Sequence, residues 1–469
     1  MNATAQPAAG RKEDLEKSLR LCIQDGLAAM PIVTMSLPVN VFITALVTKG
    51  WVLPKPAIGL LCAMPFAANF VQVFAVPYLS RLRPPKTLTV VTASLNLLCW
   101  FLLAALLEVV PRDQPNVAAA WFIGWFFVAS IFAALAGVTW NAWIQEWVPS
   151  RLRGKYFGHR NRLLQISLLS FLLITGWVLA HWEYSVRAFQ AVIVGSGLLR
   201  VASLYWQWVS PTQPHRHVEV PTLSFHAQLA VLRRSHSLLW FIAFGATWSF
   251  AANCFGPFYQ VFMFEQLGFS AWDVGVLSTV SALGGALSLP AWGRLLDRYG
   301  NRPVMAVSLL VWQGVNVLWC TLTPSSNTLL YLIWALGGMT SMGAIASAGF
   351  VLGQFTILLR LIPLEAKSLA IGLNLAVTSL AAAIAPVIGG GVLSWALTRW
   401  TDAVAVYHAC FLLQPVLATA GCLLLLRVHE PQASPLTMVF GAMRNIRTLS
   451  GVLGLDFLVN YVFYRPPKR

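Results

Sequence analysis

Long uncharged stretches of apolar residues recur along this 469-residue chain. Many are longer than about 18 residues, the length that marks a candidate membrane-spanning helix. Hydrophobic residues make up 58% of the chain, charged residues 10%, and the mean hydropathy is +0.69. A soluble core cannot bury so many apolar side chains, so the sequence predicts a polytopic membrane protein.

The composition of these stretches favours helices over the alternating strands of an outer-membrane barrel, because runs rich in Leu, Ala, Val and Phe satisfy their backbone hydrogen bonds internally as helices. The predicted fold class is therefore all-α. Charged residues and Pro or Gly breaks divide the apolar runs into twelve predicted transmembrane helices. These begin near Asp25, Ala57, Leu88, Val117, Leu163, Ala188, Leu238, Asp273, Val304, Leu329, Leu369 and Ala403.

The positions of the basic residues predict the orientation in the membrane. If the N-terminus is cytoplasmic, the cytoplasmic segments hold 26 of the 32 Lys and Arg residues, and only five lie on the other side. This asymmetry is typical of inner-membrane proteins. We therefore expect a multi-pass protein of the cytoplasmic membrane with both termini in the cytoplasm. Topology and anionic lipid account for the net charge of +16 without a nucleic-acid partner.

Two pairs of similar segments lie at nearly the same spacing in the chain. The segment AIGLL from Ala57 and the segment DVGVL from Asp273 lie 216 residues apart, and each opens a helix that ends in a basic loop. The segment VPSRLRGKYFG from Val148 aligns with IPLEAKSLAIG from Ile362, 214 residues later. The matches predict two pseudo-symmetric six-helix bundles, a pattern typical of transporters that carry their solute between the repeats.

The predicted organisation has five parts. A cytoplasmic N-terminal segment covers residues 1–22, and the N-terminal bundle covers residues 23–209. Residues 210–237 are too polar to span a membrane and are expected to form a cytoplasmic linker, whose histidines we interpret as solvated rather than metal-binding. The C-terminal bundle covers residues 238–427. A basic tail over residues 428–469 is expected to lie on the inner membrane surface or to bind a partner.

A charged loop after the eighth predicted helix resembles the signature of a known family. Its pattern is Gly293-x-Leu295-x-Asp297-Arg298-x-Gly300-x-Arg302. Together with the duplicated six-helix halves, it resembles the major facilitator superfamily and in particular its bacterial members. The segment from Trp143 to Asn161, with Arg153-Gly154-x-x-x-Gly158-x-Arg160, is similar to the loop between helices 4 and 5 in many of those members. The resemblance implies a secondary transporter that works by alternating access.

The resemblance also implies a gate. Asp297 would contact the start of the fifth helix, near Asn161 in the opposite half, and favour the outward-open state, while Glu146 would contact Arg81 or Arg83. The first half has Arg81 in place of the acid, so we expect an asymmetric gate. The alternative is a solvated turn whose arginines serve topology only. The gating candidates are Gly293, Asp297, Arg298, Gly300, Arg302, Glu146, Arg81 and Arg153.

Ionisable residues are rare in the predicted helices. Asp25, at the predicted start of the first helix, is either a proton or cation site or a helix-end charge. Arg200, in the sixth helix, either holds a substrate carboxylate or phosphate or extends its charge towards the membrane surface. Because no carboxylate lies in the middle of a predicted span, the chain lacks the obvious proton carrier of a drug/proton antiporter.

Neutral polar and aromatic side chains supply the remaining binding candidates. Amides beside aromatic rings suit a neutral hydroxylated solute such as a sugar, although each of them also suits helix–helix hydrogen bonding. The Gly256-Pro257 pair predicts a bend in the seventh helix, beside several of them. The candidates are Asn40, Trp140, Asn141, Trp248, Asn253, Tyr259, Gln260, Gln354 and Asn374.

The predicted function is secondary active or facilitative transport of a small solute, such as a sugar. Export of drug-like or organic-anion compounds is the alternative, and a non-transporting membrane sensor or assembly factor is the alternative of another class. The sequence has no metalloprotease motif, nucleophile elbow or phosphate-binding loop, so we expect no enzyme activity. We expect a monomer without cofactor or metal, whose partners are the solute and the lipid bilayer.

Overall fold

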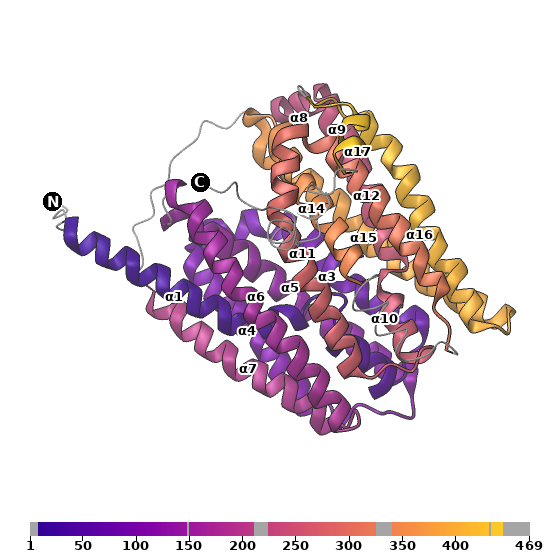
Figure 1. The fold of residues 1–469 in the computed structure, drawn as a ribbon. Helices are drawn as coiled ribbons and strands as arrows, with labels where there is room; N and C mark the ends of the chain where they lie inside the picture. Colours follow the sequence, from indigo (N-terminus) through magenta and orange to yellow (C-terminus); the bar gives the residue numbers. More distant parts are fainter. Residues whose placement is uncertain (1–7, 148–149, 211–223, 325–339, 431–432, 444–469) are drawn as a thin grey trace, which may run out of the picture. The chain divides into compact units, whose positions relative to one another are not determined.

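All regular secondary structure in the described part of the chain is helical (Figure 1). The computed structural model describes residues 8–147, 150–210, 224–324, 340–430 and 433–443. Within these ranges, eleven helices are long and apolar enough to cross a membrane. The predicted all-α membrane fold is confirmed.

The chain divides into two compact units. The first unit is Met1–Val220 with Ser270–Trp272, and the second is Pro221–Phe269 with Asp273–Arg469. Before Val220 the helices are α1 (Ala8–Met35), α2 (Val41–Ala45), the π-helix η1 (Leu46–Gly50), α3 (Lys55–Leu82), α4 (Pro85–Leu106), α5 (Pro115–Trp147), α6 (Ser150–His181) and α7 (Val186–Val209). After it come α8 (Phe225–Arg234), α9 (His236–Cys254), α10 (Gly256–Glu265), α11 (Ala271–Tyr299), α12 (Asn301–Val317), η2 (Leu318–Thr321), α14 (Thr340–Leu361), η4 (Leu364–Ala366), α15 (Lys367–Arg399), α16 (Ala403–Leu426) and α17 (Leu436–Met443).

The first helix differs from its prediction in both start and continuity. Helix α1 begins at Ala8, so the predicted start near Asp25 is wrong and Asp25 lies well inside the helix. Hydropathy locates the apolar part of a helix, whereas the hydrogen-bonded helix continues through the charged residues before it. The chain then breaks before α2, where the side-chain oxygen of Asn40 accepts a hydrogen bond from the backbone N–H of Ile43 at 2.9 Å.

The other predicted spans each correspond to helices of the structure. The predicted break in the seventh helix is confirmed, because α9 ends at Cys254 and α10 begins at Gly256 with Pro257 in its first turn. The predicted start of the tenth helix, Leu329, lies outside the described residues, which resume in α14. Most of the predicted linker and of the C-terminal tail also lies outside them, apart from α8 and α17.

Aromatic side chains form a core between the helices of the first unit. Phe42 contacts Trp100 and Phe189 with ring centroids 6.3 and 5.8 Å apart. The indole N–H of Trp51 donates to the backbone carbonyl of Val110 at 3.1 Å, so this buried ring is also hydrogen-bonded. Around this core, α1 packs against α6 and α7, and α5 packs against α3 and α4.

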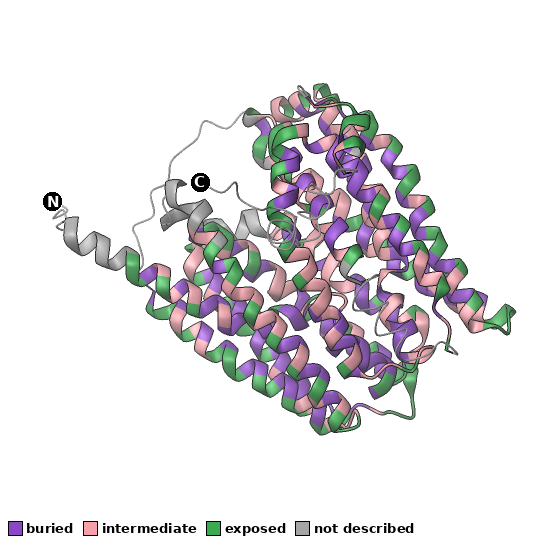
Figure 2. Cartoon of the chain, viewed as in Figure 1, coloured by how far each residue is buried: buried purple, intermediate pink, exposed green. Residues whose placement is uncertain are grey.

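Exposed residues, green in Figure 2, occur along the helices. Many of them are large and apolar. Helix α4, for example, exposes Val91, Leu95, Leu98 and Leu102, which share one side of the helix. Such a stripe is unfavourable in water and favourable against lipid chains, because lipid is as apolar as the side chains themselves.

The turn between α11 and α12 depends on one glycine. Gly300 has φ +91° and ψ 162°, a conformation that is essentially restricted to glycine. A Cβ atom at this position would lie 3.0 Å from the Cα atom of Ala433, which is closer than ordinary van der Waals contact. The signature loop therefore needs glycine here for both backbone and packing reasons.

We expect Gly300→Ala to lower the free energy of unfolding by about 1–3 kcal/mol, the cost of a strained backbone residue. The thermal transition of the full chain in detergent measures this loss. Gly314→Ala is the matched control, because Gly314 lies in α12 with nothing within 4 Å of an added Cβ. Equal transitions for the two variants would contradict the strain at Gly300.

Candidate functional site

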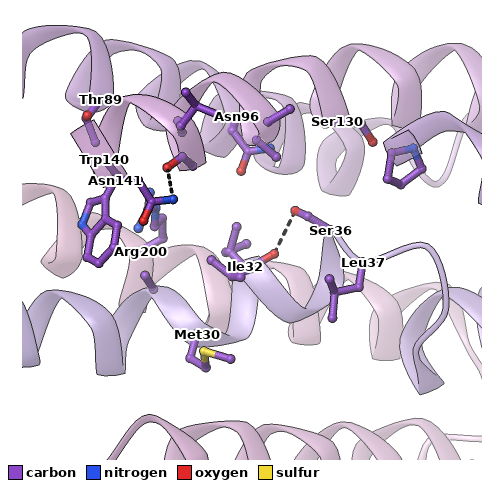
Figure 3. A pocket seen from close by; sticks show the side chains of 18 of the residues that line it. Met30, Ile32, Ser36, Leu37, Thr89, Asn96, Ser130, Trp140, Asn141 and Arg200 are labelled. Carbon is purple, nitrogen blue, oxygen red and sulfur yellow. Dashed lines mark hydrogen bonds between the residues drawn. The ribbon is translucent and has the colours of Figure 1, made fainter. Parts of the chain in front are cut away.

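A cavity of about 570 Å³ lies within the first unit, among helices α1 and α3 to α7. Figure 3 shows Trp140, Asn141 and Arg200 towards one end of it, and Ser130, Ser36 and Leu37 towards the other. The charged residues that line it are Asp25, Arg160 and Arg200, whereas Met30, Leu37 and other apolar side chains line much of the rest. The charged residues of the cavity thus gather at the end that holds Trp140 and Arg200.

The carboxylate of Asp25 is buried and accepts hydrogen bonds from three different side chains. The hydroxyl of Ser203 and the amide of Gln207 donate to Oδ1 at 2.6 and 2.8 Å, and the indole N–H of Trp140 donates to Oδ2 at 3.2 Å. The guanidinium of Arg200 lies 3.9 Å from Oδ1 and donates to the Ser203 hydroxyl at 2.8 Å. A buried charge needs such partners, since it has lost its hydration.

Arg160 connects α1, α5 and α6 at the same end of the cavity. Its Nε atom donates to the backbone carbonyl of Cys22 at 3.3 Å, and its guanidinium lies 4.6 Å from the centre of the Trp140 ring. One helical turn earlier, the hydroxyl of Tyr156 donates to the carbonyl of Leu19 at 2.8 Å, and burial raises the pKa of this hydroxyl so that it stays a donor. These contacts hold Trp140 over Asp25.

Several polar atoms in the cavity wall are buried and have no hydrogen-bond partner among the described residues. They are Nε of Arg200, Oε1 of Gln207, Oε1 of Gln72 and the hydroxyl of Ser130. Buried polar groups in proteins are normally paired, with protein, water or ligand. The residues of the wall therefore carry donors and acceptors that no described protein group uses.

The structure brings together some of the predicted site residues and separates others. Asp25 and Arg200, predicted as separate sites, share one cluster, and the prediction that Asp25 is a charge at a helix start is wrong. Trp140 and Asn141 also line the cavity. Asn40 does not: its amide group is used in holding the break between α1 and α2, where it also donates to three backbone carbonyls.

Sequence reasoning missed Ser203, Gln207 and Arg160 as members of this cluster. A signal was present for two of them, because Arg200, Ser203 and Gln207 have the spacing i, i+3, i+7 of one helix face. Arg160 belongs to the quoted motif between helices 4 and 5 but was not considered as a site residue. Nothing in the sequence pairs Asp25 with a residue 175 positions later.

The other predicted binding residues belong to the second unit. Trp248 is buried in an apolar core with Trp312 and Phe350, and the Tyr259 ring stacks on Phe411 with centroids 4.1 Å apart. The amide of Asn253 donates to the carbonyl of Ser249 at 2.7 Å. The side chains of Gln260, Gln354 and Asn374 are half-buried, on α10, α14 and α15. Their role in solute binding stays a prediction.

The signature loop is anchored by an acid that the sequence reasoning did not select. The buried carboxylate of Glu430 accepts from the backbone N–H groups of Asn301 and Arg302 at 3.1 and 2.7 Å, and from the side chain of Asn301 at 2.8 Å. Arg360, from the end of α14, forms an ion pair with it at 3.2 Å. The carboxylate thus occupies the positive N-terminal end of α12.

Asp297, the predicted gating acid, is exposed, unlike the buried Glu430. Asp297 and Arg298 are exposed on the last turn of α11, and in the part of the chain that the structure describes Asp297 forms no ion pair within 4.0 Å. Gly293 lies on α11 with open space around it. The side chains of Arg81, Glu146 and Arg153 lie outside those described, so the latch stays a prediction.

We expect Glu430→Gln to lower the free energy of unfolding by about 2–3 kcal/mol, because the amide cannot replace a charged acceptor of several hydrogen bonds. Thermal unfolding of the full chain in detergent measures the loss. Glu365→Gln is the control, since Glu365 is an exposed acid in η4. A loss no greater than that of the control would contradict the anchoring role.

Comparisons with known proteins point to one family. The family model described as Major Facilitator Superfamily matches residues 239–464. The MFS-type efflux transporter phmH of Phaeosphaeria nodorum (strain SN15) is 26% identical over 199 residues, which cover 41% of this chain and 33% of that protein. The uncharacterized MFS-type transporter YfiU of Bacillus subtilis (strain 168) is 35% identical over 119 residues, 25% of this chain and 21% of that protein. The chain therefore matches about a third and a fifth of the lengths of these curated relatives.

A solved structure matches over most of the chain. The crystal structure of a D-xylose-proton symporter aligns with a TM-score of 0.67 and covers 89% of this chain and 99% of that one. The sequence identity is 13%, so the similarity concerns the fold alone. This fold and the family match agree with the resemblance found in the signature loop.

Proposed function

We propose that the chain is a membrane-spanning transporter of the major facilitator superfamily, whose model matches residues 239–464, and that it couples movement of a small organic solute to a proton through Asp25. The solute moves by alternating access. We also propose that the protein resides in the cytoplasmic membrane with both termini inside, as the distribution of Lys and Arg predicts.

One observation carries the proton proposal: a buried carboxylate lies on α1, which packs against the candidate membrane spans α6 and α7, and it lines the cavity. Ionisable groups in such a position are costly and are functional candidates by default. Asp25 has neutral donors on two helices and Arg200 within 3.9 Å, so its ionised form is compensated. Protonation would remove the charge that attracts Arg200 and weaken the hydrogen bonds from α5 and α7, so the proton would act directly on the contacts of α1 with these helices.

The mixed lining of the cavity supports two alternative solute classes. A neutral polar solute such as a sugar uses the amides of Asn69, Gln72 and Asn141. The long apolar wall from Met30 to Leu37 supports the alternative, a drug-like or organic-anion solute with an apolar body. The efflux transporter of Phaeosphaeria nodorum is consistent with that alternative.

We expect Asp25→Asn to reduce solute-driven proton movement to the level of empty liposomes, because the amide cannot take up and release a proton. The assay places the full chain in proteoliposomes with an internal pH dye and adds a panel of sugars, amino acids and organic anions. Asp113→Asn is the control, since Asp113 is exposed in the loop before α5.

Two outcomes of this assay are decisive. Proton movement that persists in Asp25→Asn would refute the role of this carboxylate. No flux of any solute with the unsubstituted chain would favour the sensor or assembly factor over a transporter.

We further propose that Asp297 stabilises the outward-open state by a contact with the opposite half. Because Asp297 is exposed, Asp297→Asn should leave folding intact. Loss of an acid from a helix N-terminus shifts an equilibrium by about two- to fivefold, so access of a membrane-impermeant thiol reagent from the cytoplasmic side should rise by that factor. Glu108→Gln, an exposed acid just after α4, is the control. Unchanged access and unchanged transport kinetics would contradict the latch.

A further inference from the structure

The charged end of the cavity has an unbalanced charge. Among the described residues that line it, the only charged groups are Asp25, Arg160 and Arg200, so their formal charges sum to +1. All three are at least nine-tenths buried. An uncompensated buried charge is unfavourable, and a bound anion removes that cost.

Arg200 has unused hydrogen-bonding capacity at this position. Its NH1 group donates to Ser203 and faces Asp25, but its Nε atom is buried without a partner among the described residues. A guanidinium presents its donors as a planar fork that matches the two oxygens of a carboxylate. The pairing with Asp25 leaves part of this fork for a second acceptor.

The rest of the cavity limits what can be attached to that acceptor. Asp25 and Ser36 both line the cavity and are eleven positions apart, which corresponds to about 16 Å along a helix. Between them α1 contributes Met30, Ile32 and Val33 to the lining, and Phe66 of α3 adds an aromatic ring. Figure 3 shows Met30 and Ile32 on the same ribbon, between Arg200 and Leu37 in the view. This wall suits an apolar group.

We propose that the cavity of the first unit binds a monoanionic amphipathic solute, whose carboxylate is held by Arg200 and whose apolar body lies along α1. This inference rests on the proposed transport function and names its solute class. Asp25 and the solute carboxylate compete for the same guanidinium. Removing the charge of Asp25 therefore strengthens anion binding, and removing that of Arg200 weakens it.

The test compares three compounds of one shape: 4-butylbenzoate, its amide 4-butylbenzamide, and 4-butylbenzylammonium. Each is titrated calorimetrically into the full-length chain in lipid nanodiscs, with the heats of empty nanodiscs subtracted. We expect the carboxylate to bind more tightly than the amide, and the ammonium to bind weakest. Equal affinities of the three compounds would overturn the proposal.

Substitutions of Arg200 test whether its charge causes the preference for the carboxylate. Arg200→Gln should weaken carboxylate binding by about 10- to 100-fold, the range of a charge-assisted hydrogen bond, and leave amide binding nearly unchanged. Arg187→Gln is the matched control, because Arg187 is an exposed arginine of α7 outside the cavity lining. Arg200→Lys keeps the charge without the fork, so it should retain the preference for an anion at reduced affinity.

Asp25→Asn distinguishes a binding role from damage to the fold. It should tighten carboxylate binding by roughly threefold or more, since a like charge near the ligand is removed. Weaker carboxylate binding in Asp25→Asn, or equal losses in Arg200→Gln and Arg187→Gln, would overturn the proposal.

If the compounds bind without charge preference while Asp25→Asn still abolishes proton movement, the solute class is wrong and the proposed function stands. If carboxylate binding follows the prediction but no solute moves protons, the proposed function fails instead.

Discussion

The ion pair between Asp25 and Arg200 is the contact on which the polar interior of the first unit depends. An isolated charge in an apolar helix bundle surrounded by lipid is unfavourable. The opposite charges of Asp25 and Arg200 reduce this cost for each other. The 3.9 Å separation is long for a direct hydrogen bond, and Ser203 bridges the gap by accepting from Arg200 and donating to Asp25. The hydrogen bonds of the pair are therefore incomplete, because the Nε atom of Arg200 has no partner among the described residues.

Helix packing around the pair explains how it is kept in place. Helix α1 lies between α6 and α7, and each neighbour contributes polar contacts to it. Arg160 and Ser167 of α6 donate to backbone carbonyls of α1, the latter at 2.7 Å to Leu27, while Gln207 of α7 reaches Asp25 directly. A change in the charge of Asp25 thus acts on α1 itself and, through its hydrogen bonds with Trp140 and Gln207, on α5 and α7. That is the physical requirement for a group that couples binding to a change of conformation.

The second unit uses its principal buried acid for a different purpose. Glu430 accepts from the first two backbone N–H groups of α12 and pairs with Arg360, so it fixes the chain after α16 to two other helices. The exposed Asp297 is left without such a structural task in the described part of the chain, which suits a contact that forms and breaks. The acid that anchors the signature loop thus lies outside the loop, after α16, whereas the acid of the loop itself is exposed.

The sequence by itself determined the class of the fold, because the spacing of apolar runs and the lysine and arginine bias depend only on local composition and on the bilayer. The bend at Gly256-Pro257 was equally predictable, since it is recorded in a short segment. The candidate site was predicted only in part: Asp25, Arg200, Trp140 and Asn141 were selected, but as separate residues. The tertiary structure alone decided that Asp25 lies inside α1 rather than at its start, that it meets Arg200, and that Glu430 holds the signature loop. Hydropathy cannot supply these facts, because a pairing between residues 175 positions apart depends on which helix faces pack together, and that is fixed only when the whole bundle forms.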